Sequence, residues 1–456
     1  MFFTIVTGLI GLGIVIFVHE TGHFLAAKAM GIEVEAFSLG WGNPLVRFSF
    51  RGTEYRISSL PIGGYCKLKG EQNLQPGEAA ESENTGPEEG SLFSVAPWRR
   101  VLTFLAGPVS NLIFSVLILS LIWGIGFSIK TFDNRIILVS DYDNVGTAAS
   151  RYPADQAGIK TGDLIVSING KEVEHYRDIQ ELISIRAGET LSLSVERNGE
   201  ILPITITPRM NPETGGGIIG VTPWIEPVVA EVASGSPAAA AGILPGDRIV
   251  EADGKAVQNH LDFLQVLENH PLRFGLKIER NGKIIDLRMV PDYNENGTPV
   301  TGISYASITS TQRAASPLQA LYRGFSESFS IIGLSIKSFA LLFKGIDLQQ
   351  AVSGPIRITY MVGQVASSGF SEGIQTGLIA LFRFLSFLSV ALFVMNLLPI
   401  PALDGGLIVI TVFEMLRKKR ISSKVFNRYQ VFGFIFIMAL LVFTTFNDIF
   451  YFFTRL

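Results

Sequence analysis

Cysteine is almost absent from this chain of 456 residues, which has only Cys66. An intramolecular disulfide is therefore excluded, and so is a zinc site made of four cysteines. Charge is also scarce, because 17% of the residues are charged, 48% are hydrophobic and the net charge is −3. This composition is too apolar for an ordinary soluble enzyme and gives no basic surface for nucleic acid. We therefore expect a membrane protein with sizeable soluble domains, which contacts lipid and no nucleic acid.

Four apolar runs are long enough to span a hydrocarbon core of about 30 Å. The first run, residues 2–18, lacks the basic start and small-residue cleavage site of a signal peptide, so we expect a retained helix. The other three runs cover residues 101–127, 377–398 and 429–446. The sequence thus predicts a polytopic α-helical membrane protein with four transmembrane helices.

The basic residues predict the orientation of these helices. The segment LRKKRISSKVFNR, between the last two runs, has six Lys or Arg in thirteen residues, and Arg99 and Arg100 precede the second run. Since basic loops stay on the cytosolic side, both clusters should be cytosolic. Residues 128–376 and both termini are then expected on the outer side, which is the periplasm if the membrane is a bacterial inner membrane.

The predicted outer segment contains an internal repeat. PADQAGIKTGDLIVSINGKEV starts at residue 153, PAAAAGILPGDRIVEADGKAV starts at residue 237, and 12 of the 21 aligned positions are identical. Each copy predicts a short helix followed by turns and a strand. The pattern resembles PDZ domains in their circularly permuted bacterial form, which implies two PDZ-like α+β domains over 128–220 and 221–306. Such a pair could bind an extended peptide or a C-terminus by strand addition, or act only as a steric filter.

Residues 307–376 are predicted to form an amphipathic helical linker. Spacings of three and four give one apolar stripe from residue 318 to 343, which Lys337 and Lys344 interrupt. This helix could lie in the outer membrane interface or pack beneath the PDZ-like pair.

Residues 31–100 should form the cytosolic loop. Residues 36–70 are rich in aromatic and β-branched residues with Gly and Pro breaks, which predicts strands and tight turns. Residues 71–90 have six Glu and no Lys or Arg, which is typical of a mobile, solvated loop.

The motif HETGH follows the first apolar run. On a helix, His19 and His23 lie on one face and can offer imidazole nitrogens to one Zn²⁺. Glu20 can then act as the general base for an attacking water, while Gly22 leaves room for a close neighbour. The alternative is a pair of histidines hydrogen-bonded within a helix bundle. That alternative leaves the Glu20 carboxylate unpaired beside lipid, which is costly, so we favour the metal site.

A third ligand is expected from the segment NLLPIPALDGG. Asp404 stands at the cytosolic end of the third run, at a depth similar to that of His19, although a turn aspartate is the alternative. Pro399 and Pro401 require irregular backbone there, which is tolerated in a membrane only beside protein or a water-filled cavity. Asn396 could bind a substrate backbone or make a polar contact between helices. The remaining histidines fall in the predicted outer segment: His175, His260 and His270.

Together, HETGH in the first run, LDGG after a proline-broken third run and the PDZ-like copies between them resemble the site-2 protease family of intramembrane zinc metalloproteases. The motifs GWGNPL, PWRRVLTFLAGPVSN and SGPIRI extend this resemblance over nearly the whole chain. With their motifs included, we expect the transmembrane segments at 1–30, 101–127, 377–406 and 429–450. The resemblance implies a membrane-associated β-loop within 31–100.

The resemblance also implies residue roles. His19, His23 and Asp404 would be zinc ligands, and Glu20 the catalytic base. The implied substrate-binding residues are Asn396, Pro399, Pro401, Gly63 and Gly64. Two positions depart from the family pattern, since Ala391 replaces a second Asn and Leu407 a polar residue after Asp-Gly-Gly.

The expected function is therefore an intramembrane zinc endopeptidase. By resemblance, its substrate is the transmembrane segment of a pre-trimmed anti-sigma factor in envelope-stress signalling, and remnant signal peptides are a second substrate class. A non-catalytic PDZ scaffold or receptor is the alternative from another class, but it has no use for Glu20 or Asp404. A zinc transporter is a third reading, although the acids and histidines cluster near one leaflet.

Overall fold

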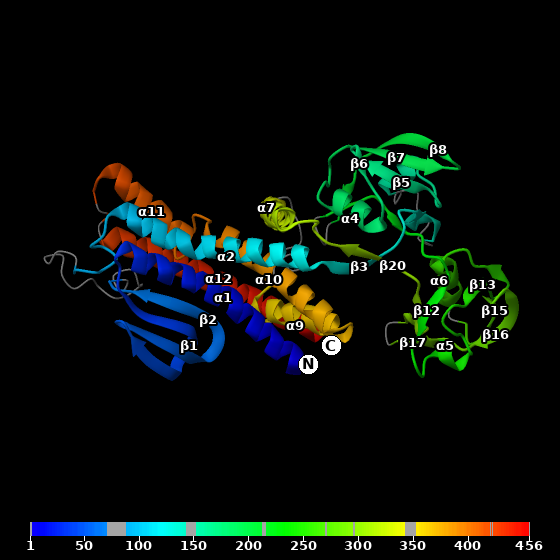
Figure 1. Cartoon of the computed structure of the whole chain (residues 1–456), viewed down its shortest axis with the longest axis horizontal. Coiled ribbons are helices and arrows are strands. Elements are labelled where there is room, and N and C mark those ends of the chain that lie inside the picture. The colour runs from blue at the N-terminus through cyan, green and yellow to red at the C-terminus, as the bar shows by residue number, and fades with distance from the viewer. Residues whose placement is uncertain are drawn as a thin grey trace. The chain divides into compact units, whose positions relative to one another are not determined.

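The computed structural model describes residues 2–70, 88–142, 152–211, 216–269, 271–294, 297–342, 353–419, 421 and 423–455. The acidic segment expected to be a solvated loop lies largely outside these residues. The chain forms two compact units, which we describe separately. Unit 1 comprises Met1–Phe127 and Gln312–Leu456, and unit 2 comprises Ser128–Thr311 (Figure 1).

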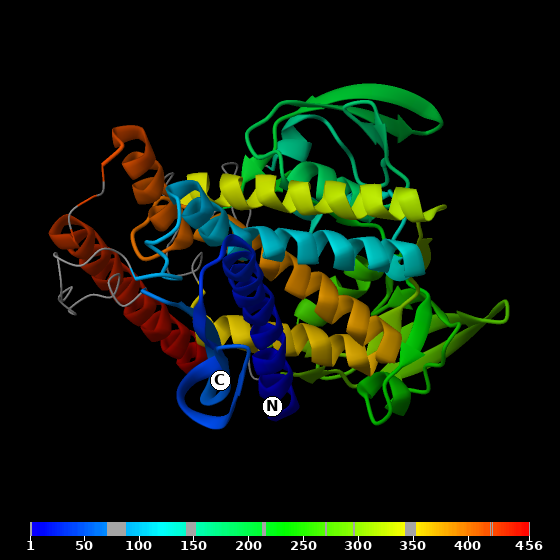
Figure 2. The same cartoon turned by 60° about the vertical axis from the view of Figure 1, so that its left-hand side comes forward.

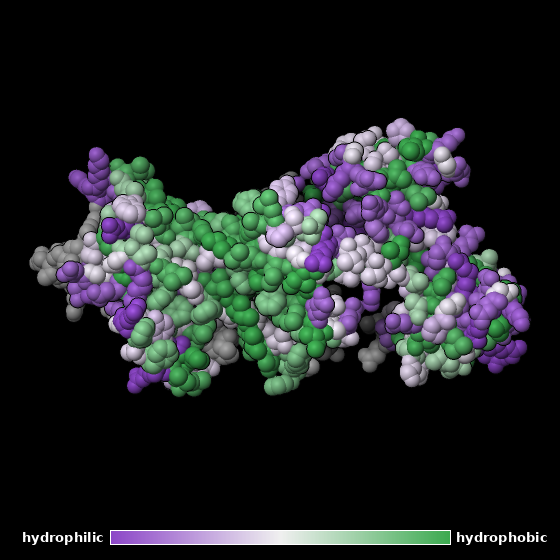
Figure 3. All heavy atoms as spheres, in the orientation of Figure 1, coloured by the Kyte–Doolittle hydropathy of each residue, from purple (hydrophilic) through white to green (hydrophobic). Residues whose placement is uncertain are grey.

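Unit 1 is a helix bundle with one β-hairpin. Its helices are α1 (Phe2–Met30), α2 (Pro97–Ile125), α7 (Pro317–Leu342), α9 (Pro355–Ser371), α10 (Ile374–Asn396), α11 (Asp404–Arg417) and α12 (Ser423–Arg455). Four segments are long and apolar enough to cross a membrane: Phe2–Met30, Pro97–Ile125, Ile374–Asn396 and Arg428–Phe450. Hydrophobic side chains cover much of the visible face of this bundle (Figure 3). The four predicted membrane helices are thus confirmed as helices.

Helix α2 is central to the bundle and packs against α1, α7, α10 and α11, while α9 packs against α1 and α10. Small residues permit these close approaches. A Cβ on Gly22 of α1 would lie 2.3 Å from the Ala106 carbonyl oxygen of α2. A Cβ on Gly363 of α9 would lie 1.8 Å from the backbone oxygen of Thr4. Backbone-to-backbone packing of this kind is the usual way for membrane helices to associate.

Helix α7 runs along α2 and α10 (Figure 2). Ala320, Gly324 and Ser328 form its buried face, and Ser328 Oγ lies 3.1 Å from Ser115 Oγ of α2. Most of the predicted apolar stripe lies outside this buried face, and Leu318 and Phe325 are exposed. Small residues of α7, and not these large side chains, therefore contact α2.

Buried charged side chains also join distant helices. The Arg100 Nη2 atom donates to Glu414 Oε2 at 2.7 Å, which ties the start of α2 to α11. Asp448 of α12 is fully buried, and its carboxylate accepts the backbone N–H groups of Gly354 and Arg357 at 2.8 and 2.9 Å. Asp448 thereby caps the first turn of α9.

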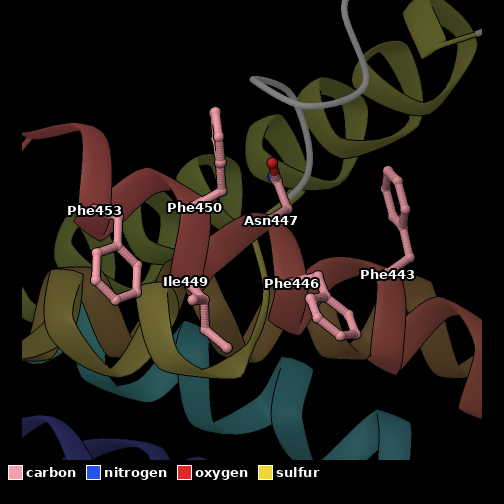
Figure 4. A pocket seen from close by; sticks show the side chains of 6 residues that line it. All are labelled: Phe443, Phe446, Asn447, Ile449, Phe450 and Phe453. Atoms are coloured by element: carbon pink, nitrogen blue, oxygen red, sulfur yellow. The ribbon is translucent and has the colours of Figure 1, made fainter.

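The C-terminal half of α12 borders a cavity of about 410 Å³ (Figure 4). Five of its lining side chains are large, apolar and exposed, and the sixth is an amide: Phe443, Phe446, Ile449, Phe450, Phe453 and Asn447. Exposed aromatic side chains suit a helix surrounded by lipid, so we attribute this face to membrane contact.

The hairpin comprises β1 (Val34–Phe50) and β2 (Thr53–Leu68), which confirms the strands expected in this loop. Ala36 pairs with both Glu54 and Lys67, so the first half of β1 lies between two segments of β2. The resulting order of segments is 44–50, 53–58, 34–39 and 64–68. Phe37 packs against Phe17 and Phe24 of α1 and holds the hairpin beside that helix.

Unit 2 contains two four-stranded sheets with the same strand order, as the internal repeat predicts. The first sheet has the order β6-β5-β7-β8 and the second β14-β13-β15-β16. The first uses β5 (Leu164–Ile168), β6 (Lys171–Glu172), β7 (Leu191–Arg197) and β8 (Glu200–Ile206), with helices α3 (Pro153–Gln156) and α4 (Tyr176–Ser184). The second uses β13 (Arg248–Ala252), β14 (Lys255–Ala256), β15 (Phe274–Arg280) and β16 (Lys283–Met289), with α5 (Pro237–Ala240) and α6 (His260–Glu268). Each half has its own apolar core.

Short strands complete the unit. They pair as β3 (Phe127–Thr131) with β20 (Ile308–Gln312), β9 (Arg209–Met210) with β10 (Gly217–Ile218), β12 (Val229–Val232) with β19 (Ile303–Tyr305), and β17 (Asp292–Tyr293) with β18 (Pro299–Val300). Strand β11 (Val221–Pro223) pairs with β4 (Ile136–Leu138). The first half therefore extends past residue 220, where the sequence places the start of the second domain.

Candidate active site

The HETGH motif lies on α1, as expected. His19 and His23 project from the same face, and their Nε2 atoms are 3.2 Å apart. Both side chains are largely buried, with relative exposures of 12%. Two imidazole nitrogens directed at one point form a ready pair of metal ligands.

Asp404 joins this pair from the opposite end of the sequence. Helix α10 ends at Asn396, the backbone is irregular through the two prolines, and α11 begins at Asp404. The Oδ2 atom of Asp404 is 3.2 Å from His19 Nε2, and the Oδ1 atom of Asp404 is 3.4 Å from His23 Nε2.

Two glycines allow the chain to turn so tightly before α11. A Cβ on Gly405 would lie 2.3 Å from the Leu398 carbonyl oxygen, and a Cβ on Gly406 would lie 2.3 Å from the Ile400 carbonyl oxygen. The LDGG motif therefore packs the proline-containing segment against the start of α11. This packing fixes the position of the Asp404 carboxylate.

The three side chains fit a zinc ion. Zinc bonds of about 2.0–2.2 Å at tetrahedral angles separate neighbouring ligand atoms by about 3.4 Å. The two Nε2 atoms are 3.2 Å apart, and each has one Asp404 oxygen at a similar distance, Oδ2 at 3.2 Å from His19 and Oδ1 at 3.4 Å from His23. Two nitrogens and one carboxylate oxygen are also a donor set typical of catalytic zinc, which keeps a fourth position open.

Helix α2 supports both histidines from behind. The backbone oxygen of Thr103 is 2.9 Å from His23 Nδ1, and the side-chain amide of Asn111 is 3.3 Å from His19 Nδ1. Gly107 lies against the His23 ring, since a Cβ there would be 2.2 Å from Nε2. We assigned no role to these α2 residues from sequence. The sequence feature that could have indicated such a role is the amide of Asn111 within an uncharged apolar run, where polar groups are usually functional.

Glu20 faces the hairpin. Its Cγ atom lies 3.5 Å from the position of a Cβ on Gly64, and its carboxylate accepts a hydrogen bond from the backbone of Cys66. The His19, His23 and Asp404 side chains are close enough to interact with it electrostatically. Segment 64–68 of β2 therefore borders the site.

The other predicted substrate residues lie at the end of α10, in the segment before Asp404 and in β2. Asn396 is the last residue of α10, and Pro399 follows in the irregular segment before Asp404. Pro401 packs against Gly433 of α12, and Gly63 has a positive φ beside the Trp41 ring. Among the predicted outer histidines, His175 and His260 lie in unit 2, and residue 270 lies outside the described residues.

An apolar cavity of about 540 Å³ lies between α1 and the hairpin. Its lining includes Ile10, Gly13 and Phe17 of α1, and Ile57 and Gly63 of β2. Gly63 directly precedes Gly64, the residue that borders Glu20.

Comparison with known proteins supports the resemblance to a protease family that the sequence motifs indicate. A protein described as a "Putative zinc metalloprotease" from Treponema pallidum is 36% identical over 98% of both chains. The regulator of sigma E protease of Haemophilus influenzae is 30% identical over 96% of this chain and 97% of its own length. The regulator of sigma-E protease RseP of Salmonella typhimurium is 29% identical over the same shares.

The relatives' names imply Zn²⁺ as the cofactor, in agreement with the fit of the three ligands. Residues 7–440 match the peptidase family M50. The chain is therefore a zinc metalloprotease that belongs to peptidase family M50, the site-2 proteases.

Proposed function

We propose that the protein is an intramembrane endopeptidase in which His19, His23 and Asp404 bind zinc and Glu20 is the catalytic base. The main support for this proposal is that these three side chains converge on one point. The histidines lie on α1 and are supported by α2, and both helices are apolar enough to span a membrane. If α1 spans the membrane, the reaction would take place where a transmembrane substrate would lie.

The roles follow from the positions of the side chains. Zinc, when bound, would supply Lewis-acid activation of a water and of the scissile carbonyl. Glu20, next to both histidines in the helix, would take the proton of the attacking water and pass it to the leaving amine. The Cys66 backbone would hold the Glu20 carboxylate in the orientation needed for that transfer.

A helical substrate hides its peptide carbonyls in hydrogen bonds to the fourth residue along the chain, so it must unwind before attack. We propose that the unwound segment adds as a strand beside segment 64–68 of β2. The apolar cavity along α1 would receive its neighbouring side chains, and Asn396 with the proline segment would contact its backbone. Strand addition provides replacement hydrogen bonds for the freed backbone groups.

Proline substitutions test this arrangement. Tyr65→Pro should reduce cleavage of a transmembrane substrate at least about ten-fold while zinc content stays unchanged, because proline interrupts a strand. Ser49→Pro, on the opposite edge of the hairpin, is the matched control and should retain cleavage. Equal cleavage by both variants and the wild type would refute a substrate strand at segment 64–68.

Two relatives are named for the regulation of sigma E, which supports an anti-sigma factor with one transmembrane segment as substrate. Cleavage of this substrate would release a cytosolic fragment and start the envelope-stress response. Remnant signal peptides would form a second substrate class. The two halves of unit 2, as PDZ-like domains, would exclude untrimmed substrates or bind newly formed C-termini.

The basic segments favour a multi-pass protein of the bacterial inner membrane with unit 2 and both termini in the periplasm. Single-cysteine labelling with a membrane-impermeant maleimide tests this orientation, since Cys66 is buried. Lys171→Cys, in unit 2, should react in spheroplasts. Lys418→Cys, after α11, should react only once the membrane is permeabilised. The reverse pattern would overturn the orientation.

The catalytic assignment is tested by zinc content and peptide cleavage together. Purified wild type should hold about one zinc per chain, lose cleavage on treatment with a chelator and regain it with zinc. Asp404→Ala should lose both zinc and cleavage, whereas His175→Ala, which removes a histidine in unit 2, should keep both. Cleavage that persists in the zinc-free protein would overturn the proposal.

A further inference from the structure

The two metal-ligand histidines are supported by different kinds of partner on α2. His23 Nδ1 faces the backbone oxygen of Thr103 at 2.9 Å. A carbonyl oxygen can only accept, so His23 Nδ1 carries the proton and Nε2 keeps its lone pair for the metal. The backbone thus selects the metal-binding tautomer of His23.

His19 faces a side chain instead. The Nδ2 atom of Asn111 is placed 3.3 Å from His19 Nδ1. An amide N–H can only donate, so this orientation requires a lone pair on His19 Nδ1 and a proton on Nε2. That proton would occupy the position where Nε2 must bind zinc.

The same orientation leaves another inconsistency. Asn111 is fully buried, and its Oδ1 atom has no hydrogen-bond partner among the described residues. The oxygen and nitrogen of a carboxamide differ little in shape, so their positions follow from the hydrogen bonds around them. A half-turn of the carboxamide puts Oδ1 next to His19 Nδ1, gives the buried oxygen a partner and frees Nε2.

We infer that Asn111 is a positioning residue of the zinc site, whose Oδ1 accepts the Nδ1–H of His19 and thereby fixes the ring and its metal-binding tautomer. This inference rests on the proposed ligand set and deepens it. Partners of this kind on the far side of a ligating imidazole typically change metal affinity by about 10–100-fold. A neutral amide provides the acceptor without adding a charge inside an apolar helix.

Two variants test whether Asn111 acts as a hydrogen-bond acceptor for His19. Asn111→Asp keeps an oxygen acceptor of the same size, and Asn111→Leu keeps the branched shape of the side chain but removes the acceptor. Ser115→Ala is the matched control, because Ser115 lies one turn further along α2, is also fully buried and hydrogen-bonds α7 rather than the site. Zinc dissociation constants are measured by competition with a chelating dye on the detergent-solubilised full chain.

The inference predicts that Asn111→Leu weakens zinc binding about 10–100-fold and that Asn111→Asp stays within about three-fold of the wild type or binds more tightly. Ser115→Ala should match the wild type. A merely structural role would make the isosteric Asp variant, with its buried charge, at least as weak as the Leu variant.

Two results would overturn the inference alone. They are zinc binding by Asn111→Leu within about three-fold of the wild type, and equal weakening in the Asp and Leu variants. A wild type that binds no zinc, or a His19→Ala variant that binds it as tightly as the wild type, would overturn the proposed ligand set and this inference with it.

Discussion

A single methyl group at Gly107 should inactivate the site without unfolding the bundle. The added Cβ would lie 2.2 Å from His23 Nε2 and 2.5 Å from its Cε1. Normal contact requires more than 3 Å, so the imidazole must move by about 1 Å or rotate away. His23 Nε2 is already 3.2 Å from His19 Nε2 and 3.4 Å from Asp404 Oδ1, which leaves no room for such a shift.

The size of the effect follows from this displacement. A misplacement of about 1 Å can lower a catalytic rate about 100-fold, and the loss of one zinc ligand should weaken zinc at least as much as the loss of a supporting partner, about 10–100-fold. The helix itself should not suffer, because Ala is favoured over Gly in a helix interior by up to about 1 kcal/mol. Gly107→Ala should therefore lose zinc and cleavage while its thermal unfolding changes little.

Gly124→Ala is the matched control on the same helix. Its Cβ would lie 3.8 Å from the Ala320 Cβ, which is ordinary contact. Zinc affinity, cleavage of a transmembrane peptide and thermal unfolding are measured for both variants. Wild-type zinc affinity and cleavage in Gly107→Ala would refute the placement of His23 against α2.

Three further predictions concern stability. Burial lowers the pKa of His260 to about 4, below its value of about 6.5 in an unfolded chain, so unit 2 should lose stability as the pH falls from 6.5 to 4. Unfolding curves of His260→Phe at several pH values should lack this dependence. The same pH dependence in the variant would contradict the prediction. Asp448→Ala should destabilise the protein by about 1–2 kcal/mol in SDS-induced unfolding through loss of the α9 cap, and an unchanged transition would exclude that role. Arg100→Met should lower the free energy of unfolding by about 3–5 kcal/mol, because it leaves the buried Glu414 carboxylate without its ion-pair partner. The double variant with Glu414→Leu should regain stability. Strictly additive losses in the double variant would show that the two side chains are not coupled.

The local part of the site could be predicted from sequence, because HETGH sets the spacing of two ligands on one helix turn. Asp404 could be proposed only from its depth and from the family resemblance, since nearly the whole chain separates it from the histidines. The support from Thr103, Gly107 and Asn111 could not be predicted in the same way. It depends on which face of α2 meets α1, and composition does not determine that face.

The fold shows the same division between local and long-range information. Apolar length predicted the four long apolar helices, and the aromatic and β-branched residues with Gly and Pro breaks predicted strands and tight turns in residues 36–70. Helix α9 was not separated within the predicted linker, because its 17 residues include Arg357 and many small polar residues. In α7 the apolar stripe is exposed and the small residues pack, since membrane helices associate through small side chains and leave large ones to lipid.

The central claim is that Glu20 is the base of a zinc hydrolase within the membrane. The most direct test compares the wild type with Glu20→Gln in detergent and scores bound zinc and cleavage of a synthetic transmembrane peptide in the same samples. The account predicts that the variant retains zinc and loses cleavage. Unchanged cleavage in the variant, or no zinc in either protein, would contradict it.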